Sequence, residues 1–323
     1  MKKRTQLRDI TGNGSVGTIT TTYEGQYLGE IISAALLSGD TLDKGGITIK
    51  PNVAYKEVVK KLSSTGLVTD ATCDFVVTAD QINLTQRVLE VEPFQVNLQI
   101  CKKDFLSDYL ALEMGASAYK NLPTSFADYL MAHVVAKVAE STENNIWGGD
   151  GAVAGEFTGL VPLAVADAGV VDVTTTATAF DSATIVAELG KIVDAIKPEV
   201  YGKEDLHLYL NTVAFKAYVR ALGGFGSVGG GGVDQQGSMW YENGGLTFEG
   251  IKVFKAPGMP SNSIIAAEKS NLFYGTALMA DSNSAKILDL SDVDGSDNVR
   301  IVLRFQSGVQ IGVTEDVVLY QLV

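Results

Sequence analysis

Hydrophobic residues along this chain recur at several different periods, and each period predicts a different element. Between Thr124 and Ile146 they fall mostly three or four positions apart, which indicates one apolar stripe along a helix. The stripe consists of Phe126, Tyr129, Leu130, Val134, Val138 and Ile146. About 22 residues at a rise of 1.5 Å each give a rod of roughly 33 Å. Asn121 and Pro123 suit the start of this helix and Gly148 suits its end, so we expect a long helix over 124–147 that lies along a sheet.

The region from residue 51 to residue 100 is rich in β-formers and predicts strands. The predicted strands are Val53–Leu62, Cys73–Val77, Ile82–Val91 and Phe94–Ile100, with breaks at 63–66 and at Glu92-Pro93. Between about residues 55 and 91 the strands carry few bulky side chains and many Thr, Asp, Gln and Lys residues. A hairpin this polar is no core element, so we expect it to project from the body of the protein.

A helical spacing also predicts three shorter helices. The first carries Tyr27, Leu28, Ile31, Ile32, Ala35 and Leu36 and must dock its apolar face on another surface. The second runs from Ile185 to Ile196, is opened by Asp181 or Ser182 and is stopped by Pro198. The third follows the strand Leu206–Leu210, with Asn211 as its cap. Residues 160–290 are therefore interpreted as a mixed α/β unit.

The last segment returns to a period of two. Val299, Ile301, Leu303 and Phe305 face one way, and Arg300, Arg304 and Gln306 face the other. We expect Gly308 to turn the chain, and the pattern to continue toward Val317–Tyr320. The resulting terminal hairpin would share a sheet with Phe94–Ile100 under the long helix. The chain would thus form two lobes, the first built from both of its ends.

Composition and charge narrow the class of protein. A chain of 323 residues that is 46% hydrophobic can bury one large core or two modest ones. No apolar run reaches the ~18 residues that a membrane span needs, and no signal-peptide pattern opens the chain, so we expect a soluble protein that stays in the compartment where it is made. The net charge of −13 argues against a surface that grips nucleic acid throughout. Cys73 and Cys101 are interpreted as buried thiols.

The sequence gives only weak signals for a catalytic or ligand-binding site. Two stretches match G-x-G-x-x-G, but neither opens a helix after a buried strand, so a flexible loop is the favoured interpretation of both. They are Gly12, Gly14 and Gly17, and Gly224, Gly226 and Gly229. His133 lies on the stripe of the long helix and His207 in a strand, and neither has a neighbour that suggests a catalytic relay. The chain thus offers no positive argument for catalysis, a metal or a cofactor.

Four segments occur in a characteristic order. They are Ser141–Gly151 at the end of the long helix, Leu210-Asn211-Thr212 leading to Tyr218–Leu222, Gly250–Val253 leading to Pro257–Pro260, and Arg304-Phe305 before Gly308. With the polar hairpin and the closing strands, this order resembles the major capsid protein of tailed double-stranded DNA bacteriophages. The resemblance covers nearly the whole chain after about residue 23, and none of its segments is a catalytic signature.

The resemblance implies an α+β fold with four parts. Residues 1–50 would be an extended N-terminal arm. Residues 51–159 would begin a P-domain, which includes a projecting E-loop (about 55–91) and a spine helix (124–147) on an antiparallel sheet. Residues 160–290 would be an inserted α/β A-domain, and residues 291–323 would complete the P-domain.

The resemblance also implies where copies of the chain meet. The arm would contact a neighbouring subunit through Tyr27, Leu28, Ile31 and Ile32, and the E-loop would reach over a neighbour. Glycines of 223–232 would adapt a loop to pentamers and hexamers. The inter-subunit residues implied on the E-loop and on this loop are Lys60, Lys61, Gly66, Gly229 and Gly230. In some relatives, neighbouring subunits are cross-linked by a covalent bond between an E-loop lysine and an asparagine. Lys56, Lys60, Lys61 and Asn298 are the right residue types, but no local pattern carries that chemistry over.

The implied function is a structural one, without enzyme activity or a cofactor. The chain would self-assemble into the icosahedral shell of a virion, after synthesis in the host cytoplasm. It would work with scaffolding, portal and decoration proteins and would enclose double-stranded DNA without sequence-specific binding and without a membrane. Two alternatives stay open: the shell protein of an encapsulin-type nanocompartment, and a nucleotide-binding enzyme that uses a glycine loop.

Overall fold

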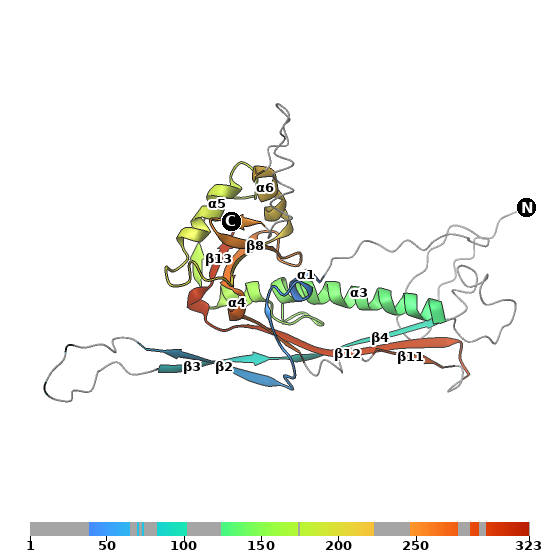
Figure 1. Cartoon of the computed structure of the whole chain (residues 1–323). Coiled ribbons are helices and arrows are strands. Elements are labelled where there is room, and N and C mark those ends of the chain that lie inside the picture. Colours follow the sequence, from blue (N-terminus) through green and yellow to red (C-terminus); the bar gives the residue numbers. More distant parts are fainter. Residues whose placement is uncertain are drawn as a thin grey trace, which may run out of the picture. The chain divides into compact units, whose positions relative to one another are not determined.

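The computed structural model describes residues 39–64, 70, 73, 83–101, 124–173, 175–222, 246–276, 285–290 and 295–322 (Figure 1). The chain divides into two compact units. The first unit consists of Met1–Ala35, Gln95–Ala136 and Ala280–Phe305, and the second of Leu36–Phe94, Lys137–Met279 and Gln306–Val323. The bounds of the four parts expected from the resemblance stay a prediction. The expected helix over residues 27–36 lies outside the described residues, as does the expected strand over residues 73–77, except for Cys73.

A six-stranded mixed sheet forms the centre of the second unit. Its order is β5 (Val171–Val173), β13 (Val318–Gln321), β9 (Ser263–Glu268), β6 (Leu206–Leu210), β8 (Ile251–Lys255) and β7 (Thr247–Phe248). Strand β6 runs parallel to β8 and antiparallel to β9. The β6 and β9 sequences are nearly continuous hydrophobic runs, which is typical of strands that are covered on both faces.

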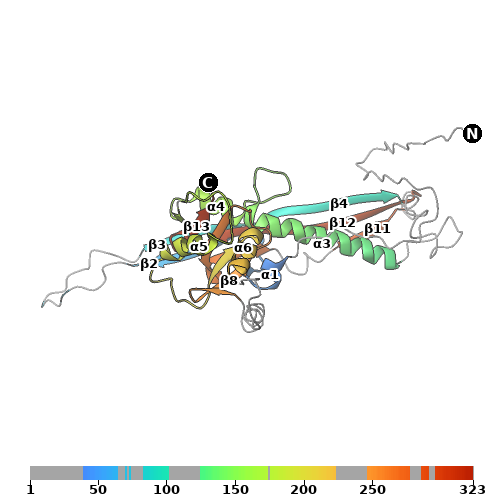
Figure 2. The same cartoon turned by 90° about the horizontal axis from the view of Figure 1, so that it is seen from above.

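Helices cover both faces of this sheet. Helices α5 (Ile185–Asp194) and α6 (Thr212–Leu222) lie side by side on one face (Figures 1 and 2) and pack on alternate strand residues such as Leu208 and Ile264. The residues between them, Tyr209 and Ile265, point to the other face. There they pack with the end of α3 (Thr124–Gly148) and with α4 (Leu160–Ala166). The period of two along each strand therefore divides the core of this unit into two clusters. We call this sheet with α5 and α6 the lobe.

The predicted helices of the lobe are confirmed, with one correction at a helix start. Asn211 caps α6, since its Oδ1 accepts the N–H of Ala214 at 2.8 Å. Helix α5 begins at Ile185 rather than at Asp181 or Ser182. The Asp181 carboxylate accepts the N–H of Ser182, so these residues form a turn before the helix.

The second unit also contains a three-stranded ladder and a separate hairpin. Strand β1 (Thr48–Lys50) runs parallel to β10 (Leu272–Thr276), and β10 pairs antiparallel with residues 307–311 of β12 (Asn298–Ile311). The hairpin consists of β2 (Lys56–Ser63) and β3 (Asn83–Glu90), which form a sheet of their own. A short helix α1 (Asp40–Asp43) and two 3₁₀ turns, η1 (Lys269–Asn271) and η2 (Thr314–Asp316), complete this unit.

Three long elements are divided between the two units. The first unit contains most of β4 (Glu92–Cys101), the strand β11 (Ala285–Asp289), and the amino-terminal parts of α3 and β12. Strand β11 pairs antiparallel with β12, and β4 pairs with β12 as well. The predicted alternation is confirmed: Val299, Ile301 and Leu303 are buried, while Arg300 and Arg304 are exposed.

Two expectations about the chain's end are wrong. Gly308 makes no turn, because β12 runs through it without interruption. A Cβ at this position would lie 2.1 Å from the Glu90 carbonyl oxygen, so glycine is needed there for a close approach of two backbones. Strand β13 does not share a sheet with Phe94–Ile100, because it pairs with β5 and β9 instead.

Candidate assembly surface

The register of the β2–β3 hairpin sorts its side chains into two faces with different character. Directly opposite residues in an antiparallel pair point to the same side. Val58 lies opposite Val88 and Leu62 opposite Leu84, so these four residues share one face, which we call the outward face. Successive residues of β2 alternate: those on the outward face are exposed, and those on the other face are half-buried.

The outward face is apolar at its centre and open to solvent. Leu62 is 67% exposed and Leu84 is 62% exposed, and Val58 and Val88 are exposed as well. Lys56 and Glu90 border this strip with an ion pair of 2.9 Å. Two exposed cross-strand pairs of large apolar side chains are a surface that a partner can cover.

Two ion pairs on the inward face hold the hairpin against the rest of the second unit. Lys61 Nζ lies 2.8 Å from a carboxylate oxygen of Glu315, and Arg87 Nη1 lies 2.6 Å from one of Asp167. The N–H of Gly169 and the Arg87 guanidinium hold the pKa of Asp167 below its usual range. Lys61 likewise lowers the pKa of Glu315. Both carboxylates are therefore charged at neutral pH, and the ion pairs direct the apolar face away from the unit's own surface.

An apolar cluster fixes the base of the hairpin. Leu89 is completely buried and packs with Val53 and Val91, and Phe273 of β10 packs against them. The hairpin is therefore anchored at one end by a small core and along one side by charges.

A second anchor fixes the start of the described chain. Glu143 of α3 is 1% exposed and accepts hydrogen bonds from the N–H (3.1 Å) and the hydroxyl (2.5 Å) of Thr41. The same hydroxyl accepts the indole N–H of Trp147 at 2.8 Å. Burial raises the pKa of Glu143, although hydrogen bonds from Thr41 and Gly258 oppose the shift. This network ties α1, which follows residues 1–38, to the carboxyl-terminal half of α3.

The structure places only part of the predicted inter-subunit set. Lys60 lies on the outward face, opposite Gln86, and Lys61 on the inward face. The remaining predicted residues lie outside the described part of the chain: Tyr27, Leu28, Ile31, Ile32, Gly66, Gly229 and Gly230.

The four apolar residues of the outward face were not predicted from the sequence. A signal was present in the sequence, because Val58 and Leu62 stand four positions apart in one strand and Leu84 and Val88 four apart in the other, a spacing that places each pair on one face of its strand. The average polarity of the segment concealed this pattern.

The lysines proposed for a covalent cross-link are only partly available. Lys56 is paired with Glu90 and Lys61 with Glu315. Asn298 is the first residue of β12.

The other candidate residues are the two cysteines, His207 and the glycine motifs. Cys73 is exposed and Cys101 is half-buried, so the expectation of buried thiols is wrong. Cys73 lies between β2 and β3 along the chain. His207 has Nδ1 2.7 Å from the Asp205 carbonyl oxygen, and burial lowers its pKa. Both glycine motifs lie outside the described residues.

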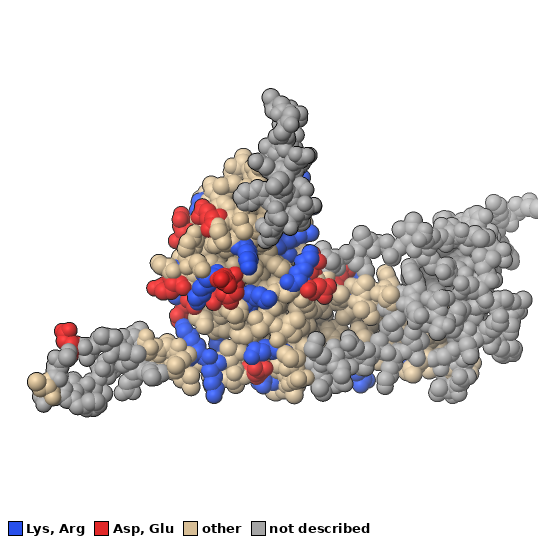
Figure 3. Space-filling view, viewed as in Figure 1, with Lys and Arg blue, Asp and Glu red and all other residues tan. Residues whose placement is uncertain are grey.

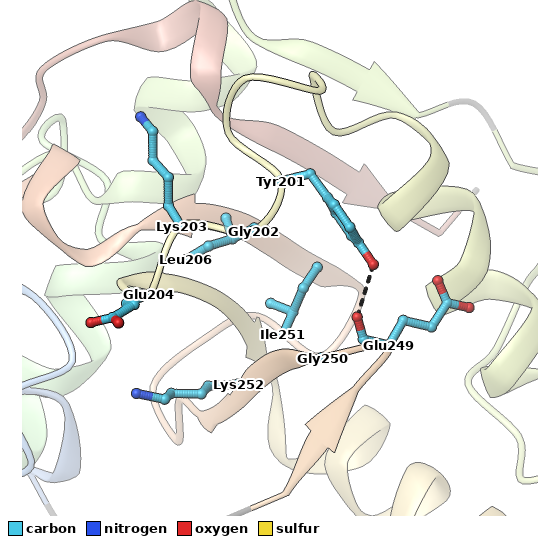
Figure 4. A pocket seen from close by; sticks show the side chains of 9 residues that line it. All are labelled: Tyr201, Gly202, Lys203, Glu204, Leu206, Glu249, Gly250, Ile251 and Lys252. Carbon is cyan, nitrogen blue, oxygen red and sulfur yellow. Dashed lines mark hydrogen bonds between the residues drawn. The ribbon is translucent and has the colours of Figure 1, made fainter.

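An open pocket of about 600 Å³ lies in the lobe between the loop at residues 201–204 and the β7–β8 turn. Tyr201 OH donates to the Glu249 carbonyl oxygen at 3.0 Å across it, and Lys203, Glu204 and Lys252 lie on the other side (Figure 4). Its charges are mixed, and its lining holds no base paired with a nucleophile. The pocket therefore gives no reason to infer a reaction.

Among the described ranges, no group of three or more His, Cys, Asp or Glu residues could hold a metal ion. No helix in the part of the chain that the structure describes combines the length and apolar character needed to cross a bilayer.

Comparisons with known proteins identify the fold. No protein-family model matches the chain, and neither does any curated protein sequence.

Solved structures do match. The capsid of an empty GTA particle superposes with a TM-score of 0.57 at 15% identity, over 94% of this chain and 95% of that chain. A structure from Mycobacterium phage Ogopogo gives 0.57 at 10% identity, over 94% and 97%. A procapsid of satellite phage P4 that includes the size determination protein gives 0.50 at 14% identity, over 87% and 96%. The chain therefore has the phage capsid fold, and the predicted fold class is confirmed.

Proposed function

We propose that this chain is the major capsid protein of a tailed double-stranded DNA bacteriophage and that its copies assemble into an icosahedral shell. Its role is structural and involves no catalytic turnover. The fold shared with phage and GTA capsids supports this proposal. In the shell, residues 1–50 act as the N-terminal arm, about 55–91 as the E-loop, 124–147 as the spine helix of the P-domain (51–159 and 291–323), and 160–290 as the A-domain.

One observation carries the proposal. The outward face of the hairpin exposes the Val58–Val88 and Leu62–Leu84 pairs, while the opposite face is tied down by the Lys61 and Arg87 ion pairs. A soluble chain gains nothing by holding apolar pairs away from its own core. A chain that buries them on a neighbouring copy gains hydrophobic free energy at each contact. The hairpin is therefore built for association with a second copy.

The remaining partners follow from this role. Copies associate as pentamers and hexamers in the virion, with scaffolding, portal and decoration proteins, and the chain is made in the host cytoplasm. The shell encloses double-stranded DNA without specific binding. A net charge of −13 suits this task, because repulsion between an acidic wall and DNA phosphates lets the genome be packed and released.

Electron microscopy of the purified protein tests the proposal. We expect closed shells at micromolar concentration. Leu62→Ser combined with Leu84→Ser should abolish them, because the polar side chains remove the apolar contact without disturbing the buried base of the hairpin. Val153→Ser serves as the matched control, since Val153 is also exposed but lies in the loop after α3, and it should assemble normally. A wild-type protein that stays monomeric at all concentrations would overturn the proposal.

A further inference from the structure

A short segment of chain lies beside the carboxyl-terminal half of α3 (Figures 1 and 2). It consists of residues 39–44, which include α1, and we call it the strap. Within the strap only Thr41 is buried, while Asp43 and Lys44 are exposed. The strap therefore lies at the surface, and Figure 3 shows charged side chains of both signs where Figure 1 places α1.

The hydrogen bonds from Thr41 to α3 meet at Glu143. The Thr41 N–H donates to one carboxylate oxygen of Glu143 at 3.1 Å, and the Thr41 hydroxyl donates to the other at 2.5 Å. The same hydroxyl accepts the indole N–H of Trp147. The contact between the strap and α3 therefore depends on one carboxyl group that is 1% exposed.

The chain that follows the strap is held more firmly. Tyr209 OH donates to the Gly46 carbonyl oxygen at 2.5 Å, and a Cβ at Gly46 would lie 2.6 Å from the Phe254 ring. Ile47, the next residue, is buried. Gly45 separates the strap from this fixed chain. Its φ is +63°, and a Cβ added there would meet only the end of a lysine side chain. Gly45 is therefore suited to act as a hinge.

The closed strap makes ionisation of Glu143 unfavourable. Burial raises the pKa of Glu143, and the negative charge of Asp40 on the strap adds to this shift. Hydrogen bonds from Thr41 and Gly258 oppose it. Opening the strap would bring water to the carboxylate and move Asp40 away, so an ionised Glu143 favours the open arrangement.

The other charges around this contact are paired. Lys44 Nζ lies 3.1 Å from an oxygen of Asp40 within the strap. One turn before Glu143 on α3, Glu140 pairs with Lys137 at 2.6 Å. The loop at residues 256–260, which packs against Glu143, contains no charged residue. Asp40 is therefore the charge on the strap that responds most directly to ionisation of Glu143.

We propose that the strap is a proton-controlled device, which stays closed on α3 while Glu143 keeps its proton and swings out on Gly45 more often once that proton is lost. The strap follows residues 1–38, so its opening frees the point at which they join the rest of the chain. All the contacts lie within one copy, so the inference goes beyond the proposed function and does not depend on it.

The dependence on pH has a definite sign. The closed state binds the proton more tightly than the open state, in which the carboxyl group has its ordinary pKa near 4.5. The closed state is therefore most favoured below pH 4.5 and loses ground as pH rises through its own, higher pKa. Within this window the ratio of open to closed copies rises by at most about tenfold per pH unit, and above it the ratio is constant.

Hydrogen exchange with mass spectrometry on the full chain in dilute solution, between pH 4 and pH 8, tests the strap. The amides of Thr41 and Lys44 are hydrogen-bonded in the closed state, and a single helical turn is not stable alone, so opening exposes both. After correction for intrinsic exchange, protection of the strap should fall as pH rises, by at most about tenfold per unit. Protection of β6 should show no such fall. Equal strap protection at all pH values would overturn the proposal.

Three variants separate the proton from the packing. Glu143→Gln imitates the protonated acid and should keep the strap protected at every pH. Asp40→Asn removes the like charge and should make the fall in protection smaller. Asp43→Asn is the matched control, because Asp43 is exposed on the same helix, and it should exchange like the wild type. The same fall in Glu143→Gln as in the wild type would refute the strap. If Glu143→Gln does not fold, identical profiles of the other two variants would refute it.

Trp147 gives an independent optical readout. The sequence contains two tryptophans, so Trp240→Phe leaves Trp147 as the single emitter. Trp147 is completely buried, and opening breaks its hydrogen bond to Thr41 and lets water approach the ring. Its emission should shift to longer wavelength as pH rises, and Glu143→Gln should abolish the shift. Emission that does not change with pH would contradict the strap. A chain that shows both readouts but never assembles would refute the proposed function alone.

Discussion

At the scale of single residues, Glu143 is a buried carboxyl group with a raised pKa. Its carboxylate is buried between α1 and α3 and holds Thr41, which in turn holds Trp147. Burial disfavours the charged carboxylate while three donors favour it, and burial dominates, so its pKa is raised above 4.5. The groups that face it are Thr41, Gly258 and Asp40, and Asp40 adds to the shift with its own negative charge.

The raised pKa of Glu143 predicts how stability depends on pH. A folded-state pKa above the unfolded value means that the folded state binds the proton more tightly. The contribution of Glu143 is therefore fully present below pH 4.5 and is lost as pH rises through the folded-state pKa. We expect the unfolding free energy of the wild-type chain to fall over this range relative to Glu143→Gln, which carries no titrating group.

Urea denaturation of the unassembled protein between pH 4 and pH 8 measures this difference. Glu204→Gln is the control, because Glu204 is exposed and should leave the pH profile unchanged. A constant difference between wild type and Glu143→Gln at every pH would show that burial does not perturb this carboxylate.

At the scale of elements, backbone spacing decides what a glycine does. Gly308 lies within β12 against the Glu90 carbonyl, whereas Gly190 lies within α5 with nothing within 4 Å of an added Cβ. The same substitution should therefore have opposite effects at these two positions.

We expect Gly308→Ala to destabilise the protein by about 2 kcal/mol or more, because the new methyl group forces two backbones apart. Gly190→Ala should stabilise it by roughly 0.5–1 kcal/mol, because alanine favours a helix interior. Chemical denaturation of both variants measures these changes. A neutral Gly308→Ala variant would mean that β12 and the end of β3 are not held at this distance.

The elements also indicate how far the sequence alone could lead. The alternation at Val299–Leu303 and the Asn211 cap were predictable because each depends on neighbours in the chain. The role of Gly308 was not, because its partner Glu90 is far away in the sequence. The outward face depends on distant residues as well, because Leu62 and Leu84 become one surface only through the register of two strands.

At the scale of the whole molecule, association and stability should be linked. A contact made only by the folded state adds to stability in proportion to the logarithm of the partner's concentration, about 2.7 kcal/mol at one hundred times the dissociation constant. The hairpin makes such contacts in the proposed function.

The melting temperature of the wild-type chain should therefore rise with its own concentration. The Leu62→Ser, Leu84→Ser variant should melt at the wild-type temperature in dilute solution, where both side chains face solvent, and should lose the rise at high concentration. Differential scanning fluorimetry over a hundredfold dilution series measures both. A wild-type melting temperature that is independent of concentration would contradict the link.

The hairpin has a consequence for the life of a newly made copy. In the described chain β2 and β3 form a ribbon of only two strands, so each has a rim of backbone groups that no third strand covers. Until a neighbouring copy covers it, this exposed hairpin can also pair with another unassembled copy in a non-native way and start a fibre. Rapid capture by a growing particle would then be a safeguard against aggregation, and the hazard would increase with the time each copy waits alone.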